Sequence, residues 1–360
     1  MTFLVQAVLA FVLTALLILW MRRPAHHLGL VDDPGGRKRH GAAVPLTGGI
    51  SMTVGFFLAL ALSLPALANQ LVLLVAIAVL ALIGVLDDIG EVSPRSKLGV
   101  QVLAAVLMTS WANHFLVHLG DLFGRGDIAL MNWGIPLTVF ATVALINGIN
   151  MLDGLDGLAG GLAFVILSLF AGFAWWASDV VSLKILVVLL GALGGFLAFN
   201  LPHPWRGHRR TFMGDTGSLV LGFVVAWYSI GLTQGYGQAV PPVVMLWVTG
   251  VVLFDLFTVT VRRILRRRDP AAPDRAHIHH ILLRRGLSPA RAVALLLGAN
   301  LALGAVGTLG WAAGVPETWL FASYVAVALA YLGMFLFPAR LLKRKRAAAP
   351  SGSGTPGPAP

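Results

Sequence analysis

Long apolar runs follow one another along almost the whole 360-residue chain. An α-helix rises about 1.5 Å per residue, so roughly 20 apolar residues can cross the hydrocarbon core of a bilayer. The runs therefore predict an all-α membrane protein, a polytopic bundle of about eleven transmembrane helices. The predicted spans are residues 3–21, 44–66, 70–86, 98–117, 131–149, 158–177, 183–201, 217–233, 241–261, 291–312 and 318–338.

The composition agrees with this class and excludes others. Hydrophobic residues make up 58% of the chain and charged residues 11%, whereas a soluble domain carries about 25% charged residues. No polar stretch is long enough to form a second domain, so residues 1–342 are predicted to be one polytopic transmembrane domain. The chain has no cysteine, which excludes disulfides and thiol chemistry. The net charge of +11 suits the basic loops of a membrane protein, and no nucleic-acid partner is expected.

The positions of the basic residues predict the orientation. If the N-terminus lies outside, every Lys and Arg except Arg125 and Lys184 falls in a cytoplasmic segment. Basic loops stay on the cytoplasmic side, so the positive-inside rule predicts an N-out, C-in chain. Residues 343–360 begin with a basic cluster and continue with Ala, Pro, Gly and Ser, which predicts a disordered cytoplasmic tail.

Three motifs with carboxylates lie where predicted spans meet the cytoplasm. They are VLDD, which ends at Asp88, NGINMLDGLDG over residues 147–157, and MGDTGS around Asp215. Each motif alone could be a polar helix end or a helix cap. Ionised carboxylates that converge near a membrane repel one another, and a divalent cation removes that repulsion. Asp and Asn oxygens, together with phosphates, are ligands that Mg²⁺ prefers, so the three motifs predict one cation-binding site.

Two basic segments face the same side of the membrane. The first runs from Arg37 to His40, before the Gly-Gly that enters the second span. The second, PDRAHIHHILLRRG, holds Arg275 and three histidines. Clustered histidines can bind zinc, but the lack of cysteine and the adjacent arginines favour a set of N–H donors for a pyrophosphate. Carboxylates, a cation and basic loops together indicate phosphoryl transfer, and the membrane setting implies a lipid substrate.

A transporter or flippase of a lipid-linked sugar is the alternative from another functional class. Such a protein is expected to carry charged residues near the bilayer midplane and is often built from internal repeats. Here no internal repeat is apparent, and Asp255 is the one acidic residue within a predicted span. These features favour an enzyme, and they leave the role of Asp255 open.

Five motifs in a fixed order resemble one known family. RKRHGAAVPLTGGI, GVLDDIG, NGINMLDGLDGLAGG, FMGDTGSL and PDRAHIHHILLRRG are similar to motifs of the polyprenyl-phosphate N-acetylhexosamine-1-phosphate transferases, in particular the bacterial undecaprenyl-phosphate GlcNAc-1-phosphate transferases. The resemblance implies Mg²⁺-dependent transfer (Mn²⁺ as a substitute) of GlcNAc-1-phosphate from UDP-GlcNAc to undecaprenyl phosphate, with release of UMP. It places the enzyme in the bacterial inner membrane, as a possible homodimer, at the first membrane step of a cell-envelope polysaccharide such as lipopolysaccharide or teichoic acid.

The resemblance also implies residue roles. Catalytic roles fall on Asp87, Asp88, Asp153, Asp156 and Asp215. Metal ligation falls on Asp215 and Asn150. Substrate binding falls on Lys97, which would hold the lipid phosphate, and on Asn147, Asn150, Arg275, His277, His279, His280, Arg37 and His40.

Three alternatives remain open within this family. One is the same reaction with another UDP-HexNAc, because epimeric sugars differ by one hydroxyl. One branch transfers phospho-MurNAc-pentapeptide, but His-Ile-His-His in place of three adjacent histidines, and Pro-Leu-Thr-Gly-Gly before the second span, favour the GlcNAc branch. The reaction could be a single displacement by the lipid phosphate, or it could pass through a covalent phosphoryl-Asp. The sequence does not separate these two routes.

Overall fold

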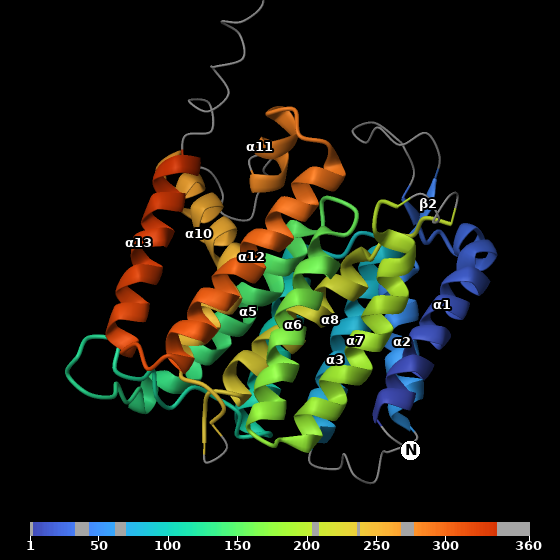
Figure 1. The fold of residues 1–360 in the computed structure, drawn as a ribbon. Helices are drawn as coiled ribbons and strands as arrows, with labels where there is room; N and C mark the ends of the chain where they lie inside the picture. The colour runs from blue at the N-terminus through green and yellow to red at the C-terminus, as the bar shows by residue number, and fades with distance from the viewer. Residues whose placement is uncertain are drawn as a thin grey trace, which may run out of the picture.

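A computed structural model describes residues 3–32, 43–61, 70–203, 209–235, 238–267 and 277–336. Within these ranges the chain is mainly helical (Figure 1). The helices that overlap the predicted spans are α1 (Phe3–His27), α2 (Gly48–Ala61), α3 (Leu71–Ile89), α4 (Pro94–Ser110), α5 (Gly134–Leu152), α6 (Leu158–Trp176), α7 (Val180–Asn200), α8 (Gly214–Gly231), α9 (Pro242–Val248), α10 (Gly250–Leu265), α12 (Pro289–Ala312) and α13 (Glu317–Phe335).

Four short elements complete the described fold. A 3₁₀ turn, η2 (Met131–Trp133), leads into α5, and a short helix, α11 (Ile278–Arg284), precedes α12. Strands β1 (Val31–Asp32) and β2 (Val44–Pro45) pair in antiparallel fashion, with Val31 opposite Pro45. The predicted tail, residues 343–360, lies outside the described residues.

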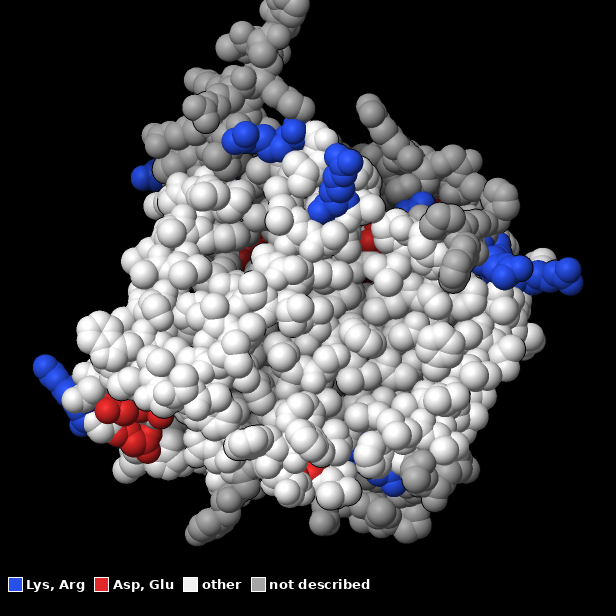
Figure 2. All heavy atoms as spheres, in the orientation of Figure 1, with Lys and Arg blue, Asp and Glu red and all other residues white. Residues whose placement is uncertain are grey.

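The helices have the length and composition of membrane spans. In the described ranges, seven helices are long and apolar enough to cross a bilayer, or eight if the bent pair α9–α10 is one span. Figure 2 shows charged side chains near the two ends of the molecule, separated by a wide uncharged band. A multi-pass, all-α membrane protein is therefore confirmed. The count of eleven spans and the N-out orientation stay predictions.

The ninth predicted span is not one straight helix. It is broken at Thr249 into α9 and α10, whose axes differ by 77°. A break leaves backbone groups without helical partners, which is costly inside a bilayer unless a neighbour supplies them. Asn300 of α12 does so, because its Nδ2 donates to the Val248 carbonyl at 3.0 Å and its Oδ1 accepts from the Val251 N–H at 3.3 Å.

Several other predicted boundaries were wrong by four residues or more. The first span was expected to end at residue 21, but α1 continues to His27. The fourth span was expected to reach residue 117, but α4 ends at Ser110 and a loop follows it. This loop closes through a bridge between His118 and Ala129. The second span was expected to begin at residue 44, but Val44 lies in β2 and the helix begins at Gly48. At the start of the second span, the pairing of β1 with β2 occupies Val44 and Pro45 and so delays the helix.

Helix α8 is the centre of the bundle. It packs against α2, α3, α5 and α6, and most of its side chains are buried. Outside this core, α1 packs against α2 and α7, while α12 packs against α6, α9 and α10. Asp215 in the first turn of α8 therefore lies at one end of the bundle, between the helices that carry the other carboxylate motifs. This end of the bundle lies at the top of Figure 1.

Candidate active site

The N-terminus of α8 is held in place by close backbone packing. The N–H groups of Gly48 and Gly49, at the start of α2, donate to the carbonyls of Phe212 and Met213 at 2.9 Å. A Cβ on Gly49 would lie only 2.3 Å from the backbone nitrogen of Gly217. The Pro-Leu-Thr-Gly-Gly and Met-Gly-Asp-Thr-Gly-Ser motifs are thus joined through their backbones, which explains why glycine is needed at the contact.

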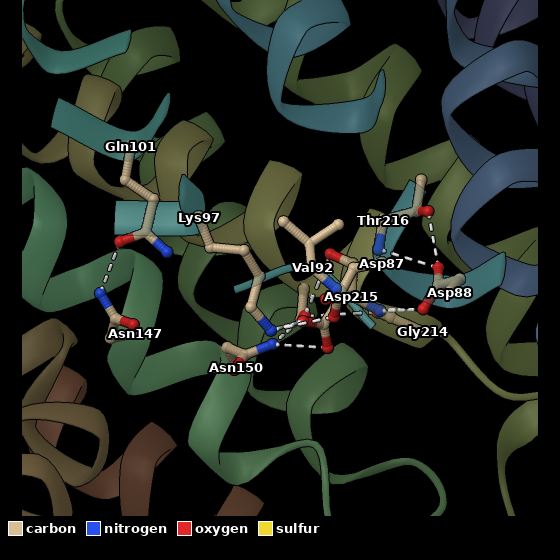
Figure 3. Close-up of polar contacts among 11 residues, drawn as sticks. Asp87, Asp88, Val92, Lys97, Gln101, Asn147, Asn150, Gly214, Asp215 and Thr216 are labelled. Atoms are coloured by element: carbon tan, nitrogen blue, oxygen red, sulfur yellow. Dashed lines mark hydrogen bonds and ion pairs between the residues drawn. The ribbon is translucent and has the colours of Figure 1, made fainter. Parts of the chain in front are cut away.

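Asp88 also binds the start of α8. Its Oδ1 accepts the N–H of Asp215 at 2.8 Å, and its Oδ2 accepts the N–H of Thr216 at 3.1 Å and the Thr216 hydroxyl at 2.7 Å (Figure 3). The first N–H groups of a helix have no partner within the helix, and a carboxylate at this position also interacts favourably with the helix dipole. Gly214 has φ of +71° and a Cβ there would lie 2.4 Å from Asp88 Oδ2, so the turn requires glycine. Asp88 therefore fixes the position of Asp215.

Lys97 lies between two carboxylates. Its Nζ is 2.9 Å from Asp87 Oδ2 and 2.9 Å from Asp215 Oδ2, and all three side chains are partly exposed (Figure 3). The other oxygen of Asp87 accepts the N–H of Val92 at 2.9 Å, which ties the end of α3 to the turn before α4. Helix α4 begins with Ser93 as its N-cap, and this start places Lys97 in the first turns of α4, facing the cluster.

Asn150 contributes an amide from the end of α5. Its Nδ2 donates to Asp215 Oδ1 at 3.1 Å and to Ser218 Oγ at 2.8 Å. Asn147, one turn earlier, binds Gln101 of α4 at 2.7 Å and not the carboxylates. The structure thus brings Asp87, Asp88, Lys97, Asn150 and Asp215 into one connected cluster and leaves Asn147 beside it (Figure 3).

The loop between α5 and α6 carries the next two predicted residues. Asp156 pairs with Arg210, whose guanidinium NH2 group is 2.8 Å away and whose Cζ lies 4.5 Å from the centre of the Phe212 ring. Asp153 ends α5 and is half-buried. Burial, and then the negative charges of Asp215, Asp88 and Asp156, raise the pKa of Asp153 to about 8. Negative charge thus exceeds positive charge among the described residues here, an environment that favours a cation.

The histidines lie at the same end of the bundle. His277 and His279 are buried, and their rings stack at 5.8 Å with an angle of 10° between planes. The ring of His280 is 4.2 Å from that of His279. His279 packs on the α5–α6 loop, since a Cβ on Gly154 would lie 2.5 Å from its Nε2. The predicted residues Arg37, His40 and Arg275 lie outside the described residues.

Several polar residues that the sequence analysis did not assign support this site. Asn200 at the end of α7 accepts the N–H of Gly157 at 2.6 Å and donates to the Thr211 carbonyl at 2.8 Å, so it joins the loop to the segment before α8. Gln101 binds Asn147, and Ser218 binds Asn150. A single Asn or Gln in an apolar run is the only signal that could have indicated Asn200 and Gln101.

The described site suits a divalent cation with few protein ligands. Within the described ranges, no three His, Asp or Glu side chains are arranged as a metal site. Mg²⁺ binds through one or two carboxylates and completes its shell with water and substrate phosphates, so it does not need three. Asp215 with Asn150 meets that requirement, provided that the Asn150 amide turns its oxygen toward the cation. A helical membrane protein with this set of groups has the layout of a membrane phosphoryl-transfer enzyme.

Comparison with known proteins defines the family. Residues 70–233 match the model of glycosyl transferase family 4. An undecaprenyl-phosphate alpha-N-acetylglucosaminyl 1-phosphate transferase of Haemophilus influenzae is 34% identical over 321 residues, which are 89% of this chain and 90% of that protein. Proteins of the same name from Salmonella typhi and Escherichia coli are 34% and 33% identical and cover 94% and 91% of this chain and 90% and 88% of their own lengths.

The chain therefore belongs to the polyprenyl-phosphate N-acetylhexosamine-1-phosphate transferases of glycosyl transferase family 4. It is a glycosyl-1-phosphate transferase, which confirms the predicted family and enzyme class.

Proposed function

We propose that this protein transfers GlcNAc-1-phosphate from UDP-GlcNAc to undecaprenyl phosphate at the cytoplasmic face of the bacterial inner membrane. The products are undecaprenyl-diphospho-GlcNAc and UMP, at the start of a cell-envelope polysaccharide. The observation that carries the proposal is the meeting of Asp87 and Asp215 at Lys97, with Asn150 of the third motif bonded to Asp215. This cluster lies at the end of the bundle that also holds the histidines. The names of the relatives support the acceptor and the sugar.

In this proposal Asp215 and Asn150 hold Mg²⁺, for which Mn²⁺ can substitute. The metal would supply a positive charge that neutralises the developing charge on the leaving UMP. The support is the donor set, since Asp215 Oδ1 and the Asn150 amide are 3.1 Å apart and both are partly exposed. Oxygen ligands of this kind suit a hard cation.

Lys97 is proposed to hold the lipid phosphate, with Asp87 orienting its ammonium group. An oxygen of that phosphate attacks the phosphorus that carries the sugar, the bond between this phosphorus and the bridging oxygen breaks, and UMP leaves with that oxygen. We favour this single displacement because an ionised phosphate needs positioning more than deprotonation. Asp88 is not proposed as the base, because both of its oxygens already accept hydrogen bonds from α8.

The donor is proposed to lie between the α5–α6 loop and the histidine segment, residues 277–280. Asp153 and Asp156 belong to the α5–α6 loop, and His279 packs directly against Gly154 of the same loop. N–H donors from the histidines, with Arg275, would bind the pyrophosphate. Asn147, Arg37 and His40 are further proposed contacts for substrate.

The purified protein in detergent provides the test, since no membrane barrier is then present. With Mg²⁺ and undecaprenyl phosphate, UMP should be released from UDP-GlcNAc faster than from UDP-GalNAc or UDP-MurNAc-pentapeptide. Omission of the lipid, or removal of divalent cations with EDTA, should stop the release. A preparation that binds UDP-GlcNAc but releases no UMP would refute the proposal. Exchange of labelled UMP into UDP-GlcNAc without lipid would instead support a phosphoryl-Asp.

His279 is expected to act as a neutral ring. Burial, and then the neighbouring His280, lower the pKa of His279 to about 3, so it stays uncharged at any pH near neutrality. We expect His279→Ala to raise the KM for UDP-GlcNAc about tenfold, through loss of one hydrogen bond to a charged group, and to do so equally at pH 7.5 and 5.5. His279→Asn, which keeps a neutral donor, should recover part of the loss. If the ratio of the mutant KM to the wild-type KM were larger at pH 5.5 than at pH 7.5, the protonated ring would be the form that binds the donor.

The same lowered pKa predicts the direction of acid sensitivity. Below the unfolded pKa of about 6.5, the unfolded chain binds a proton at His279 that the folded chain does not bind. The free energy of unfolding should therefore decrease as the pH falls from 6.5 toward 3. Thermal unfolding of His279→Asn should show a weaker dependence on pH across this interval than the wild type. An identical dependence in both proteins would contradict the assignment.

A further inference from the structure

Asp255 is a buried carboxylate in α10, away from the cluster around Lys97. Its relative exposure is 3%, and it lies within the ninth predicted span. An ionised group drawn into the membrane without a partner costs about 2.5–3.5 kcal/mol, so intramembrane carboxylates that persist are expected to have specific partners.

Two of its partners belong to the histidine segment. Asp255 Oδ2 is 2.7 Å from His277 Nδ1, and Asp255 Oδ1 accepts the N–H of Ile278 at 2.8 Å. The third contact is longer, with the hydroxyl of Tyr331 on α13 at 3.5 Å from Oδ1. Asp255 thus binds both a side chain and the first N–H of α11, and it anchors the start of this short helix to the bundle.

The contact also fixes which nitrogen of His277 carries a proton. An ionised carboxylate only accepts hydrogen bonds, so Nδ1 must be the donor to Asp255. Such a carboxylate–histidine pair holds both the orientation and the tautomer of the ring. The ring of His279 stacks on that of His277, and it packs against Gly154 of the α5–α6 loop. A continuous set of contacts therefore runs from Asp255 to the loop that carries Asp153.

We propose that Asp255 is the positioning residue of the nucleotide-sugar subsite: it orients His277 and the start of α11, and thereby holds His279 against the α5–α6 loop. The inference rests on the proposed function, in which the histidine segment binds the donor. It predicts that changes at Asp255 affect the nucleotide sugar and not the lipid, because Asp255 has no contact with Lys97 or its carboxylates among the described residues.

Asp255→Asn in the full-length protein tests the proposal. Asn has nearly the same shape and can still accept the Ile278 N–H, but its NH2 group faces His277 Nδ1 and forces the other tautomer. We expect the KM for UDP-GlcNAc to rise by about tenfold or more, the scale known for loss of the orienting partner of a metal-bound histidine. The KM for undecaprenyl phosphate should be unchanged. Tyr331→Phe, which removes only the 3.5 Å contact, is the matched control and should leave both constants unchanged.

A double mutant separates positioning from general stability. If Asp255 acts through His277, Asp255→Asn should have little further effect on the KM for UDP-GlcNAc once His277 is replaced by Ala. Additive effects, or equal changes in the KM values of both substrates, would overturn the proposal. Should Asp255→Asn fail to give folded protein, Asp255→Glu keeps the charge and the tautomer. It is expected to raise the KM for UDP-GlcNAc by less, again without an effect on the lipid, and unchanged donor kinetics would count against the role.

The outcomes also distinguish this inference from the proposed function. If His277→Ala and His279→Ala leave UDP-GlcNAc kinetics unchanged, the histidine segment does not bind the donor, and both ideas fail. If those two variants raise the KM for UDP-GlcNAc and Asp255→Asn does not, only the role of Asp255 is refuted.

Discussion

Asp215→Asn is expected to lower kcat by about a hundredfold to a thousandfold, because a metal-bound carboxylate supplies several kcal/mol of transition-state stabilisation and each 1.36 kcal/mol is tenfold in rate. The substitution keeps the shape of the side chain and removes its charge. It would weaken both proposed functions of Asp215, as a metal ligand and as an ion-pair partner of Lys97, whose Nζ lies 2.9 Å away. The measurement is the initial rate of UMP release as a function of Mg²⁺ concentration.

A carboxylate at the opposite end of the bundle provides the control. Asp121 accepts the N–H groups of Arg125 and Gly126, contacts that Asn can also make. Asp121→Asn should therefore have wild-type kinetics in the same assay. Near-normal turnover of Asp215→Asn at saturating Mg²⁺ would remove Asp215 from the proposed metal site.

Much of the fold could be predicted because apolar runs of the length of a bilayer have few other stable conformations. The break at Thr249 could not be predicted in this way. Residues 241–261 form one predominantly apolar segment, and the group that stabilises the break, Asn300, is 49 residues beyond Val251. Hydropathy describes how a segment interacts with lipid, and it carries no information about a hydrogen bond supplied by another helix.

The site, like the fold, was predictable in part from the sequence. The carboxylate motifs could be expected to meet, because each ends or begins a span on the same predicted side. The partners of each carboxylate could not be predicted, since Asp87 and Asp88 are neighbours in sequence yet bind different elements. Asp87 binds Lys97 of α4, and Asp88 binds the start of α8. Successive residues on a helix point in directions about 100° apart, so one pair of aspartates serves two different purposes.

Asp88→Ala is the second change with a large expected effect. It would leave the N–H groups of Asp215 and Thr216 and the Thr216 hydroxyl without their acceptor. Each buried donor that loses its partner costs about 1–3 kcal/mol, so thermal stability should fall. The start of α8 would shift, and a displacement of about 1 Å in a reacting group can cost a hundredfold in rate. We therefore expect a lower kcat together with a higher Mg²⁺ requirement.

Comparison with another helix cap shows whether the loss of activity follows from displacement of Asp215 or only from a lower stability of the protein. Asp179 caps α7 through the N–H of Ser182 at 3.0 Å, at the end of the bundle opposite the site. Asp179→Ala should lower the thermal stability but leave kcat and the Mg²⁺ requirement unchanged, because α7 begins far from Asp215. If Asp88→Ala instead lost only kcat, with wild-type stability and Mg²⁺ response, Asp88 would be acting on the lipid phosphate as a base. Its three hydrogen bonds to α8 argue for the combined loss of stability and Mg²⁺ response, because they hold the start of the helix that carries Asp215.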